Sequence, residues 1–467
     1  MLPKHLVSLS AGLMTFTVHT AAQPKPNIII IYADDLGYGD LGCYGSKVNR
    51  TPHLDQMAKD GIRFTDFYSA APVSSPSRAA LLTGRYPIRM GINHVFFPES
   101  FTGIPASEIK MSELLRQQGY QTGIVGKWHL GHMHQFLPLQ NGFDEYFGIP
   151  YSNDMRSVVY MQGNDVEQFF VNQDSITFTC TQKAIRFIEN HKNRPFFLYL
   201  AHNMPHVPIA ASANFKGKSA NGLYGDVIEE LDWSVGQILE KLDDLGLDKN
   251  TIIIFSSDNG PWLTEGPMGG VATPLFQGKG TTWDGGQRVP AIIRWKDRIR
   301  GGQVNSEVAA MVDWFPTLVK FAGGTVPADR IIDGCDLAPV LLGAGKRAHQ
   351  DFAYLHNGRL HAFRSGEWKI LLPENMYKGN FWVEDVPAHD TLFFNMKNDI
   401  AESTDVKKKY PNEYRTTLAK LNNFAQTLKD CPPSLVLSES EGVTLTNQQR
   451  RDAINEARAK GIKAKSE

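Results

Sequence analysis

Residues 27–32 read Asn27-Ile28-Ile29-Ile30-Ile31-Tyr32, a run without a charged side chain. A continuous β-branched run predicts a strand that is buried on both faces, as in a parallel sheet covered by helices. Similar runs follow at 121–125, 195–201 and 251–256. Segments with helical apolar spacing separate them, at 52–61, 107–118, 180–192 and 223–245. This alternation predicts an α/β fold with a large, mostly parallel sheet flanked by helices.

The pattern changes from about Val340 onward. Two short apolar segments, 360–364 and 368–372, are separated by Ser365-Gly366, which predicts a β-hairpin. A helix is expected to follow over 412–429. These features predict a smaller α+β subdomain behind the main sheet. The predicted division of the chain is a signal peptide (1–22), a catalytic domain (23–340), a C-terminal subdomain (341–432) and a polar tail (433–467).

The N-terminal residues have the pattern of a cleavable export signal. A short polar start at Lys4-His5 precedes a mildly apolar run over 6–18, and Thr20-Ala21-Ala22 offers small residues for cleavage. The run is too short for a stable membrane span, and no other stretch reaches the required length. We therefore expect a periplasmic or secreted protein, the alternative being a membrane-anchored terminus.

Composition narrows the function further. Hydrophobic residues make up 42% of the 467 residues and 21% are charged, so a sizeable buried core is expected. The net charge is −1, from 48 basic and 49 acidic residues, which argues against a basic surface for nucleic acid. Four cysteines occur without a CxxC pair, so a thiolate zinc site is not expected. An oxidising compartment allows one or two disulfides, whose pairing the sequence leaves open.

Charged side chains follow all four apolar runs. Ligands of open parallel sheets bind beyond the carboxyl ends of the strands, so these side chains are expected at one edge. In chain order they are Asp34-Asp35, then Lys127 with His129, then His202 with His206, then Asp258-Asn259. Each pair alone could be a solvated turn, but four together predict a site.

The acids and the amide make a hard-oxygen site. Calcium takes about 6–8 oxygen ligands and tolerates irregular geometry, whereas magnesium prefers a stricter octahedron. No cysteine or histidine lies directly beside the acids, which disfavours zinc.

A candidate nucleophile lies in the run Ser74-Ser75-Pro76-Ser77-Arg78. Ser75 fits a helix N-cap and Pro76 the first helical position. Ser74 would then lie at the positive end of the helix, where anions are favoured, with Arg78 able to reach the same end. Taken alone, this run is equally that of an ordinary capped helix.

The longer run 74–84, SSPSRAALLTG, is similar to the signature of the sulfatase family. In that signature the first residue, cysteine or serine, is oxidised to formylglycine. Other resembling segments are NIIIIYADDLGYGDLG (27–42), GKWHLG (126–131), GFDEYFGIPYSNDM (142–155), SSDNGP (256–261) and GKGTTWDGGQRVP (278–290). The resemblance is to the arylsulfatase A and N-acetylgalactosamine-6-sulfatase branch. It extends from about Pro26 to near Leu372.

The resemblance implies an alkaline-phosphatase-like fold and a complete set of site residues. One Ca²⁺ ion would be bound by Asp34, Asp35, Asp258 and Asn259 together with residue 74. Ser74 would become 3-oxoalanine (formylglycine) through a dedicated maturation enzyme acting before export. The residues implied around the hydrated aldehyde and the sulfate are Arg78, Lys127, His129, His206 and Lys279. His206 fits the His-x-Pro of the family, and His202 is the reserve candidate.

The reaction implied by the resemblance is hydrolysis of a sulfate monoester. One hydroxyl of the formylglycine hydrate would attack sulfur to give a sulfo-enzyme, and the second would expel sulfate with His129 as base. His206, with Lys279, would protonate the departing oxygen, while Ca²⁺, Lys127 and Lys279 neutralise negative charge. A sulfated sugar of a polysaccharide or glycosaminoglycan is the expected substrate.

Two alternatives stay open. One is a phosphomonoesterase or phosphodiesterase of the same superfamily, although Lys127 and Lys279 stand where a second metal would need ligands. The other is an inactive relative that only binds a sulfated glycan.

Overall fold

The computed structural model describes residues 24–155, 158–374, 382–383, 386 and 388–435, with the backbone of 439–440 and 443–444. The predicted signal peptide and nearly all of the predicted polar tail lie outside the described residues. Within the described part, no helix is long and apolar enough to cross a membrane. Cys43, Cys180, Cys335 and Cys431 are all unpaired, so neither of the allowed disulfides is present.

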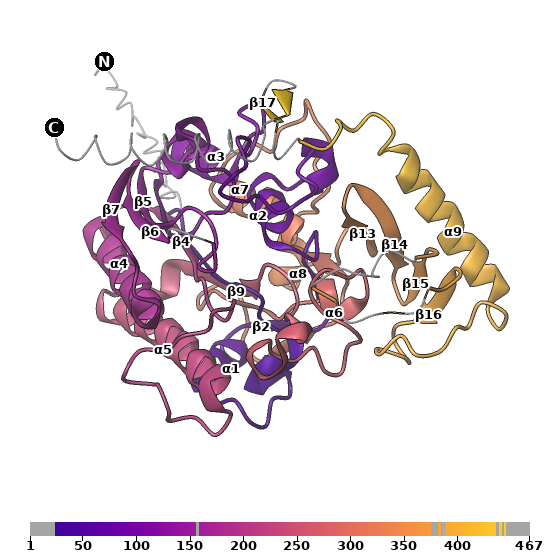
Figure 1. Cartoon of the computed structure of the whole chain (residues 1–467), viewed down its shortest axis with the longest axis horizontal. Coiled ribbons are helices and arrows are strands. Elements are labelled where there is room, and N and C mark those ends of the chain that lie inside the picture. The colour runs from indigo at the N-terminus through magenta and orange to yellow at the C-terminus, as the bar shows by residue number, and fades with distance from the viewer. Residues whose placement is uncertain are drawn as a thin grey trace, which may run out of the picture.

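A ten-stranded mixed sheet forms the centre of the molecule, with the order β11-β2-β10-β9-β1-β8-β4-β5-β6-β7 (Figure 1). Its strands are β1 (Asn27–Ala33), β2 (Ile62–Phe64), β4 (Gln121–Lys127), β5 (Glu145–Ile149), β6 (Val159–Gln162), β7 (Asp165–Phe169), β8 (Phe196–Ala201), β9 (Thr251–Ser257), β10 (Ala291–Arg294) and β11 (Gln303–Asn305). The five central strands β9, β1, β8, β4 and β5 run parallel. The four predicted strands are therefore confirmed as β1, β4, β8 and β9, and they are neighbours.

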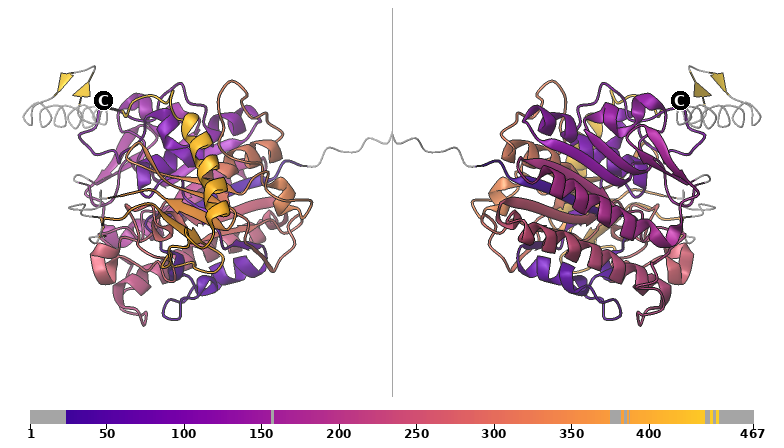
Figure 2. Two further views of the ribbon diagram at one scale, coloured as in Figure 1. Left: turned by 90° about the vertical axis from the view of Figure 1, so that its right-hand side faces the viewer. Right: turned by 90° about the vertical axis from the view of Figure 1, so that its left-hand side faces the viewer.

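Alternate residues of β1 face two separate cores. Ile28 and Ile30 pack with residues of α2 (Ser74–Thr83), α3 (Met111–Gln117) and α7 (Trp314–Phe321). Ile29 and Ile31 pack with residues of α1 (Pro52–Lys59), α4 (Ile176–His191) and α5 (Gly222–Asp244). All four isoleucines are fully buried. Figure 2 shows the long helices α4 and α5 across one face of the sheet, so the prediction of a strand covered on both sides is confirmed.

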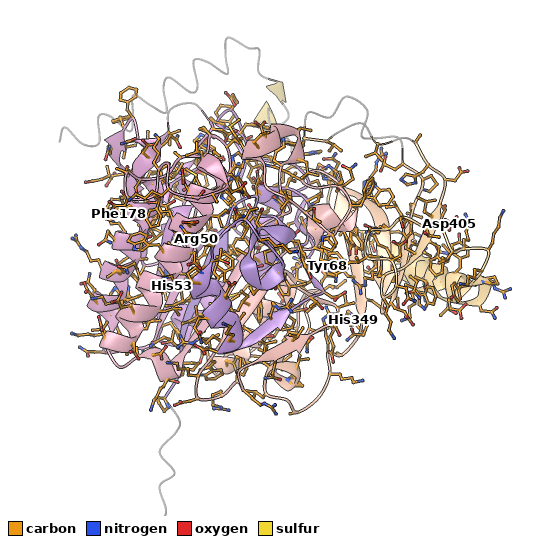
Figure 3. The ribbon with its side chains drawn as sticks, turned by 90° about the horizontal axis from the view of Figure 1, so that it is seen from below. Arg50, His53, Tyr68, Phe178, His349 and Asp405 are labelled. Atoms are coloured by element: carbon orange, nitrogen blue, oxygen red, sulfur yellow. The ribbon has the colours of Figure 1, made fainter. Side chains whose placement is uncertain are left out.

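A smaller antiparallel sheet follows, with the order β13-β14-β15-β16. Its strands are β13 (Asp351–His356), β14 (Arg359–Ser365), β15 (Trp368–Leu371) and β16 (Leu392–Asn395), and α9 (Pro411–Gln426) contacts β14 and β15. The predicted hairpin is confirmed as β14 and β15. Tyr68, at the end of β3 (Phe67–Tyr68), stacks on Phe352 with ring centroids 4.6 Å apart. Figure 3 labels Tyr68, which also meets Tyr354 edge-on, so β3 contacts the C-terminal sheet.

The remaining elements are short connections. They include α6 (Asp284–Gln287), α8 (Ala338–Leu341), β12 (Ala309–Ala310, paired with β3), the strands β17 (Glu439–Ser440) and β18 (Val443–Thr444), and several short 3-10 helices. The antiparallel strands β6, β7 and β10 were not predicted, because each is short and lies at or near a sheet margin. The predicted helix 107–118 begins four residues later, at Met111.

Candidate active site

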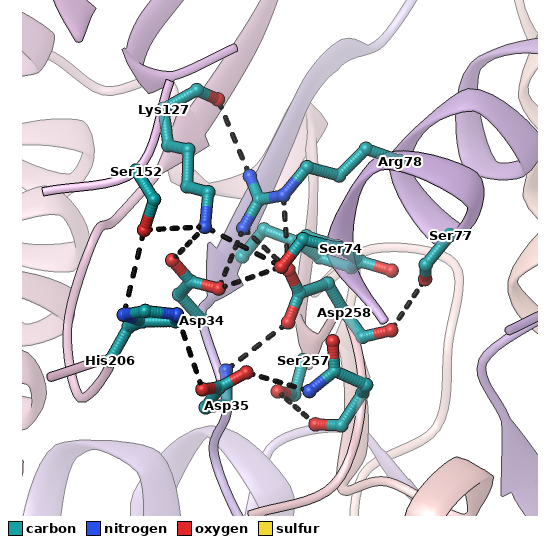
Figure 4. Close-up of polar contacts among 12 residues, drawn as sticks. Asp34, Asp35, Ser74, Ser77, Arg78, Lys127, Ser152, His206, Ser257 and Asp258 are labelled. Atoms are coloured by element: carbon teal, nitrogen blue, oxygen red, sulfur yellow. Dashed lines mark hydrogen bonds and ion pairs between the residues drawn. The ribbon is translucent and has the colours of Figure 1, made fainter. Parts of the chain in front are cut away.

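The carboxyl ends of adjacent strands bring the predicted acids together. Asp34 and Asp35 follow β1, and Asp258 follows its neighbour β9. One oxygen from each of these three carboxylates lies within 4.8 Å of the others, and all three side chains are buried. Asn259 joins the cluster by donating from Nδ2 to Oδ1 of Asp35 at 2.7 Å. Figure 4 shows the carboxylates of Asp34 and Asp258 beside Ser74, at the start of α2.

The helix α2 begins two residues earlier than the sequence suggests. Its first residue is Ser74, because Val73 is extended and its carbonyl accepts from the Ser77 amide at 3.3 Å. The prediction of Ser75 as N-cap is therefore wrong. The Ser75 hydroxyl instead accepts a hydrogen bond from the Phe96 amide at 3.0 Å. Pro76 lies at the third helical position, where its missing N–H costs nothing because the first four helical amides have no partner within the helix.

Ser74 is placed among the acids and a lysine. Its hydroxyl lies 3.2 Å from Oδ1 of Asp34 and 3.4 Å from Nζ of Lys127, and the residue is 2% exposed. Lys127, the last residue of β4, also lies 2.5 Å from Oδ2 of Asp34. Burial opposes ionisation of Asp34, but Lys127, His206 and Arg78 together hold its pKa below the usual value.

Arg78 spans the cluster from one turn further along α2. Its Nε and Nη2 both donate to Oδ2 of Asp258, at 3.0 and 2.8 Å, and Nη2 lies 3.5 Å from Oδ1 of Asp34. Its Nη1 donates to the Lys127 carbonyl at 3.3 Å. Burial opposes its charge, but Asp258, Tyr199 and Asp34 more than offset this, so the pKa of Arg78 is raised.

Lys279 contacts the second acid of the Asp34-Asp35 pair. Its Nζ lies 2.7 Å from Oδ2 of Asp35 and 4.3 Å from the ring centroid of Trp262. Three cations, Lys127, Arg78 and Lys279, therefore surround three carboxylates at one sheet edge, and a sulfate group entering here would meet two ammonium groups.

The three candidate histidines have different surroundings. Nε2 of His206 lies 3.6 Å from Oδ2 of Asp35. Nε2 of His129 lies 2.8 Å from the Phe96 carbonyl, which leaves Nδ1 without a partner among the described residues. His202 points to the helix α5, where its Nε2 meets the Ser234 hydroxyl at 3.1 Å. The structure thus brings His206 to the acids and keeps His202 in contact with the helix layer.

Burial governs the charge of two of these histidines. It lowers the pKa of His129, and the nearby charges of Lys127 and Arg78 lower it further. Burial also lowers the pKa of His202, to about 3. Both side chains are therefore neutral at neutral pH.

The oxygen cluster fits a hard cation. Oδ1 of Asn259 is buried and has no hydrogen-bond partner among the described residues, and a buried orphan oxygen needs a ligand or a donor. The carboxylates of Asp34, Asp35 and Asp258 supply the other oxygens. Asp35 has φ 63°, a left-handed conformation that is uncommon outside glycine and typical of functional sites.

Two contact residues were not predicted. Ser152 Oγ lies 3.2 Å from Nζ of Lys127 and 3.5 Å from Nδ1 of His206. It follows β5, a strand that sequence reasoning did not recognise because Glu145-Tyr146-Phe147-Gly148-Ile149 contains a charge and a glycine. Had β5 been predicted, the strand-end rule would have included Ser152. Trp262, under Lys279, follows no strand end directly, and no sequence signal indicated it.

Comparison with known proteins identifies the family of the chain. The family model described as Sulfatase matches residues 26–324. N-acetylgalactosamine-6-sulfatase of Canis lupus familiaris is 43% identical over 390 residues, covering 78% of this chain and 73% of that protein. Arylsulfatase G of Rattus norvegicus is 35% identical over 467 residues, covering 87% of each chain. The structure of the PsFucS1 sulfatase from Pseudoalteromonas sp. has a TM-score of 0.79 and 27% identity, covering 87% of this chain and 91% of that one.

Fold and site together define a hydrolase of the alkaline phosphatase superfamily. The chain belongs to the sulfatase family. It is a sulfuric ester hydrolase, as the resemblance implied.

Proposed function

We propose that this sulfatase acts on a sulfated sugar, with Ser74 at the reacting centre. The main support for this proposal is the position of the Ser74 hydroxyl, which lies 3.2 Å from Oδ1 of Asp34 and 3.4 Å from Nζ of Lys127. A sugar substrate is supported by the name of the N-acetylgalactosamine-6-sulfatase relative, at 43% identity.

The proposed metal is one Ca²⁺ ion, held by Asp34, Asp35, Asp258, Asn259 and the side chain at position 74. When bound, it would neutralise charge on the sulfate oxygens. All donors in this set are oxygens, and the unpartnered Oδ1 of Asn259 is accounted for by such an ion.

The proposed modification converts Ser74 to 3-oxoalanine through a formylglycine-generating maturation enzyme. In hydrated form this group would supply the nucleophile that an unmodified serine cannot regenerate. Arg78 would stabilise negative charge on the hydrated group at position 74, since its guanidinium lies beside both Asp34 and Asp258.

The other side chains divide binding and proton transfer. Lys127 and Lys279 would orient the sulfate through their ammonium groups. His129 would accept a proton at Nδ1, because its lowered pKa leaves the ring neutral and Nδ1 has no partner among the described residues, while Nε2 meets the Phe96 carbonyl. His206 would protonate the departing sugar oxygen from Nε2, since a hydrogen bond from Nδ1 to the Val207 carbonyl at 2.5 Å fixes the ring.

Export and the domain division belong to the same proposal. A signal peptide over 1–22 would carry the chain to the periplasm or outside the cell. The catalytic domain would cover 23–340 and the C-terminal subdomain 341–432. The family model, which ends at residue 324, supports a boundary after the main sheet.

A panel of sulfated mono- and oligosaccharides, scored by released sulfate, tests the substrate. We expect release from at least one sulfated amino sugar or galactose, and the same turnover to be absent from the matching phosphate esters. Faster release of phosphate than of sulfate would contradict the proposal and favour the phosphatase alternative.

A further inference from the structure

The segment 278–287, which carries Lys279, is fastened to two parts of the main domain. The Lys279 amide donates to the Pro261 carbonyl at 2.9 Å. The Gly280 amide donates to the Pro72 carbonyl at 3.0 Å, two residues before Ser74. These bonds place the segment between the end of β9 and the start of α2, but they hold only its first residues.

The end of the segment is bonded to the main domain as well, since the Gly286 carbonyl accepts from the Gly260 amide at 2.9 Å and the Gln287 carbonyl from the Ser69 amide at 2.7 Å. The middle of the segment is held by the C-terminal sheet. Nζ of Lys369, on β15, lies 3.0 Å from the Thr282 carbonyl, 3.0 Å from Oδ1 of Asp284 and 2.6 Å from Oε1 of Glu402. The Lys369 side chain is fully buried. The ammonium group donates hydrogen bonds to Thr282 and Asp284, and its charge is paired with the Glu402 carboxylate. Thr282 is only three residues beyond Lys279, so Lys369 reaches the catalytic segment directly.

Glu402 completes the fastening from the chain after β16. Its Oε2 accepts a hydrogen bond from the Asp284 amide at 2.6 Å. Glu402 is fully buried and has φ 54°, a conformation that non-glycine residues seldom adopt unless their surroundings hold them there. Asp284 also accepts from the hydroxyls of Tyr354 at 2.7 Å and Tyr68 at 2.9 Å, so it is held by the C-terminal sheet and by β3.

The C-terminal chain also contacts the turn beside Lys279. Gly280 has φ +80°, and a Cβ placed there would lie 3.0 Å from Cβ of Trp382 and 3.1 Å from Cγ2 of Val383. The turn is therefore closed on one side by Pro72 and on the other by the C-terminal chain.

We propose that Lys369 and Glu402 are positioning residues that hold Lys279 against Asp35, so that the C-terminal sheet completes the site. The inference rests on the proposed role of Lys279 in orienting sulfate. Removing one member of a buried ion pair leaves its partners without compensation, and the segment must shift to satisfy them. A displacement of about 1 Å at a charged positioning group can cost about 100-fold in rate.

The test is a double-mutant cycle between Lys369 and Lys279. We expect Lys369→Met to lower kcat for sulfate release by about 10- to 100-fold. In a Lys279→Ala background the same substitution should have almost no further effect, because the group it positions is gone. Lys420→Met is the matched control. Lys420 donates hydrogen bonds to Ser365 at 2.8 Å and Asp351 at 3.2 Å, both in the C-terminal sheet. Its substitution should leave kcat unchanged.

A second readout requires no activity. Hydrogen exchange of a peptide covering 276–287 should be faster in Lys369→Met than in the wild type, because the segment loses the bonds from Lys369 to Thr282 and Asp284 and opens more often. Lys420→Met should leave this exchange unchanged. Should Lys369→Met fail to fold, Glu402→Gln replaces it. One amide oxygen can keep only one of the two Glu402 contacts, so a smaller loss in the same direction is expected.

The outcomes separate the two proposals. The positioning role would be overturned if the losses of kcat from Lys369→Met and Lys279→Ala multiplied in the double variant. Unchanged hydrogen exchange over 276–287 in Lys369→Met would also overturn it. Full activity of Lys279→Ala alone would instead overturn the proposed role of Lys279 in the reaction.

Discussion

Lys127 and Asp34 form a fully buried ion pair, with Nζ 2.5 Å from Oδ2. The same ammonium lies 3.4 Å from the Ser74 hydroxyl, so the pair links β4, β1 and the start of α2. A charge held in this way is preorganised, because no solvent must rearrange when negative charge develops beside it. The account of the site depends on this arrangement.

Lys127→Met should lower kcat by about 100- to 1,000-fold, the scale seen when one charge-stabilising donor is lost. Lys110→Met is the matched control. Lys110 is also buried, but its Nζ pairs with Oε1 of Glu113 at a distance of 2.9 Å, and this pair is not part of the site. Steady-state kinetics with an activated aryl sulfate measures both. Equal losses of kcat in the two variants would mean that burial, not position, explains the effect.

Asp258→Asn should abolish the stabilisation of the protein by added calcium. A ligand at about 100 times its Kd stabilises the folded state by about 2.7 kcal/mol, which thermal unfolding detects. The control is Asp232→Asn, another buried aspartate, which accepts from the His53 and Leu54 amides at 3.1 and 2.8 Å. Asp232→Asn should keep the calcium response. A calcium response retained by Asp258→Asn would contradict the proposed ligand set.

His206→Gln and His202→Gln form a second matched pair. His206→Gln should reduce turnover of a sulfated sugar more than that of an activated aryl sulfate, because a good leaving group needs little protonation. His202→Gln should leave the ratio of the two rates unchanged, since His202 contacts Ser234 instead of the acids. A change in this ratio in His202→Gln alone would show that the reserve candidate is the proton donor.

Arg78→Met should destabilise the fold as well as the site. It removes both donors to Oδ2 of Asp258 and leaves a buried carboxylate, at a cost of about 3–5 kcal/mol. Arg50→Met, which breaks the ion pair between the exposed Arg50 and Glu229, should leave the free energy of unfolding nearly unchanged. Urea unfolding of unmatured protein measures both. If the two variants lost similar free energies of unfolding, the ion pair of Arg78 with Asp258 would have to be exposed to water.

The sequence predicted what depends on local pattern. The apolar runs at 27–32 and 251–256 became adjacent strands, and the strand-end rule placed Asp34 and Asp258 together. It failed where pattern was weak, as at β5 and the following Ser152.

Contacts between distant segments could not be predicted. Nothing in the sequence next to Lys369 or Glu402 indicates that these residues contact Thr282 and Asp284. That contact depends on how the C-terminal sheet packs against the main domain. The start of α2 is a similar case. The local preference of Ser75 for an N-cap gave way to a hydrogen bond from the distant Phe96 amide.

The central claim is that residue 74 is the modified, reacting residue, and the mass of its peptide tests it most directly. In active protein from a host that contains the maturation enzyme, we expect the peptide carrying Ser74 to lack two hydrogen atoms, and Ser74→Ala to release no sulfate. Full activity in protein whose Ser74 is entirely unmodified would contradict the account.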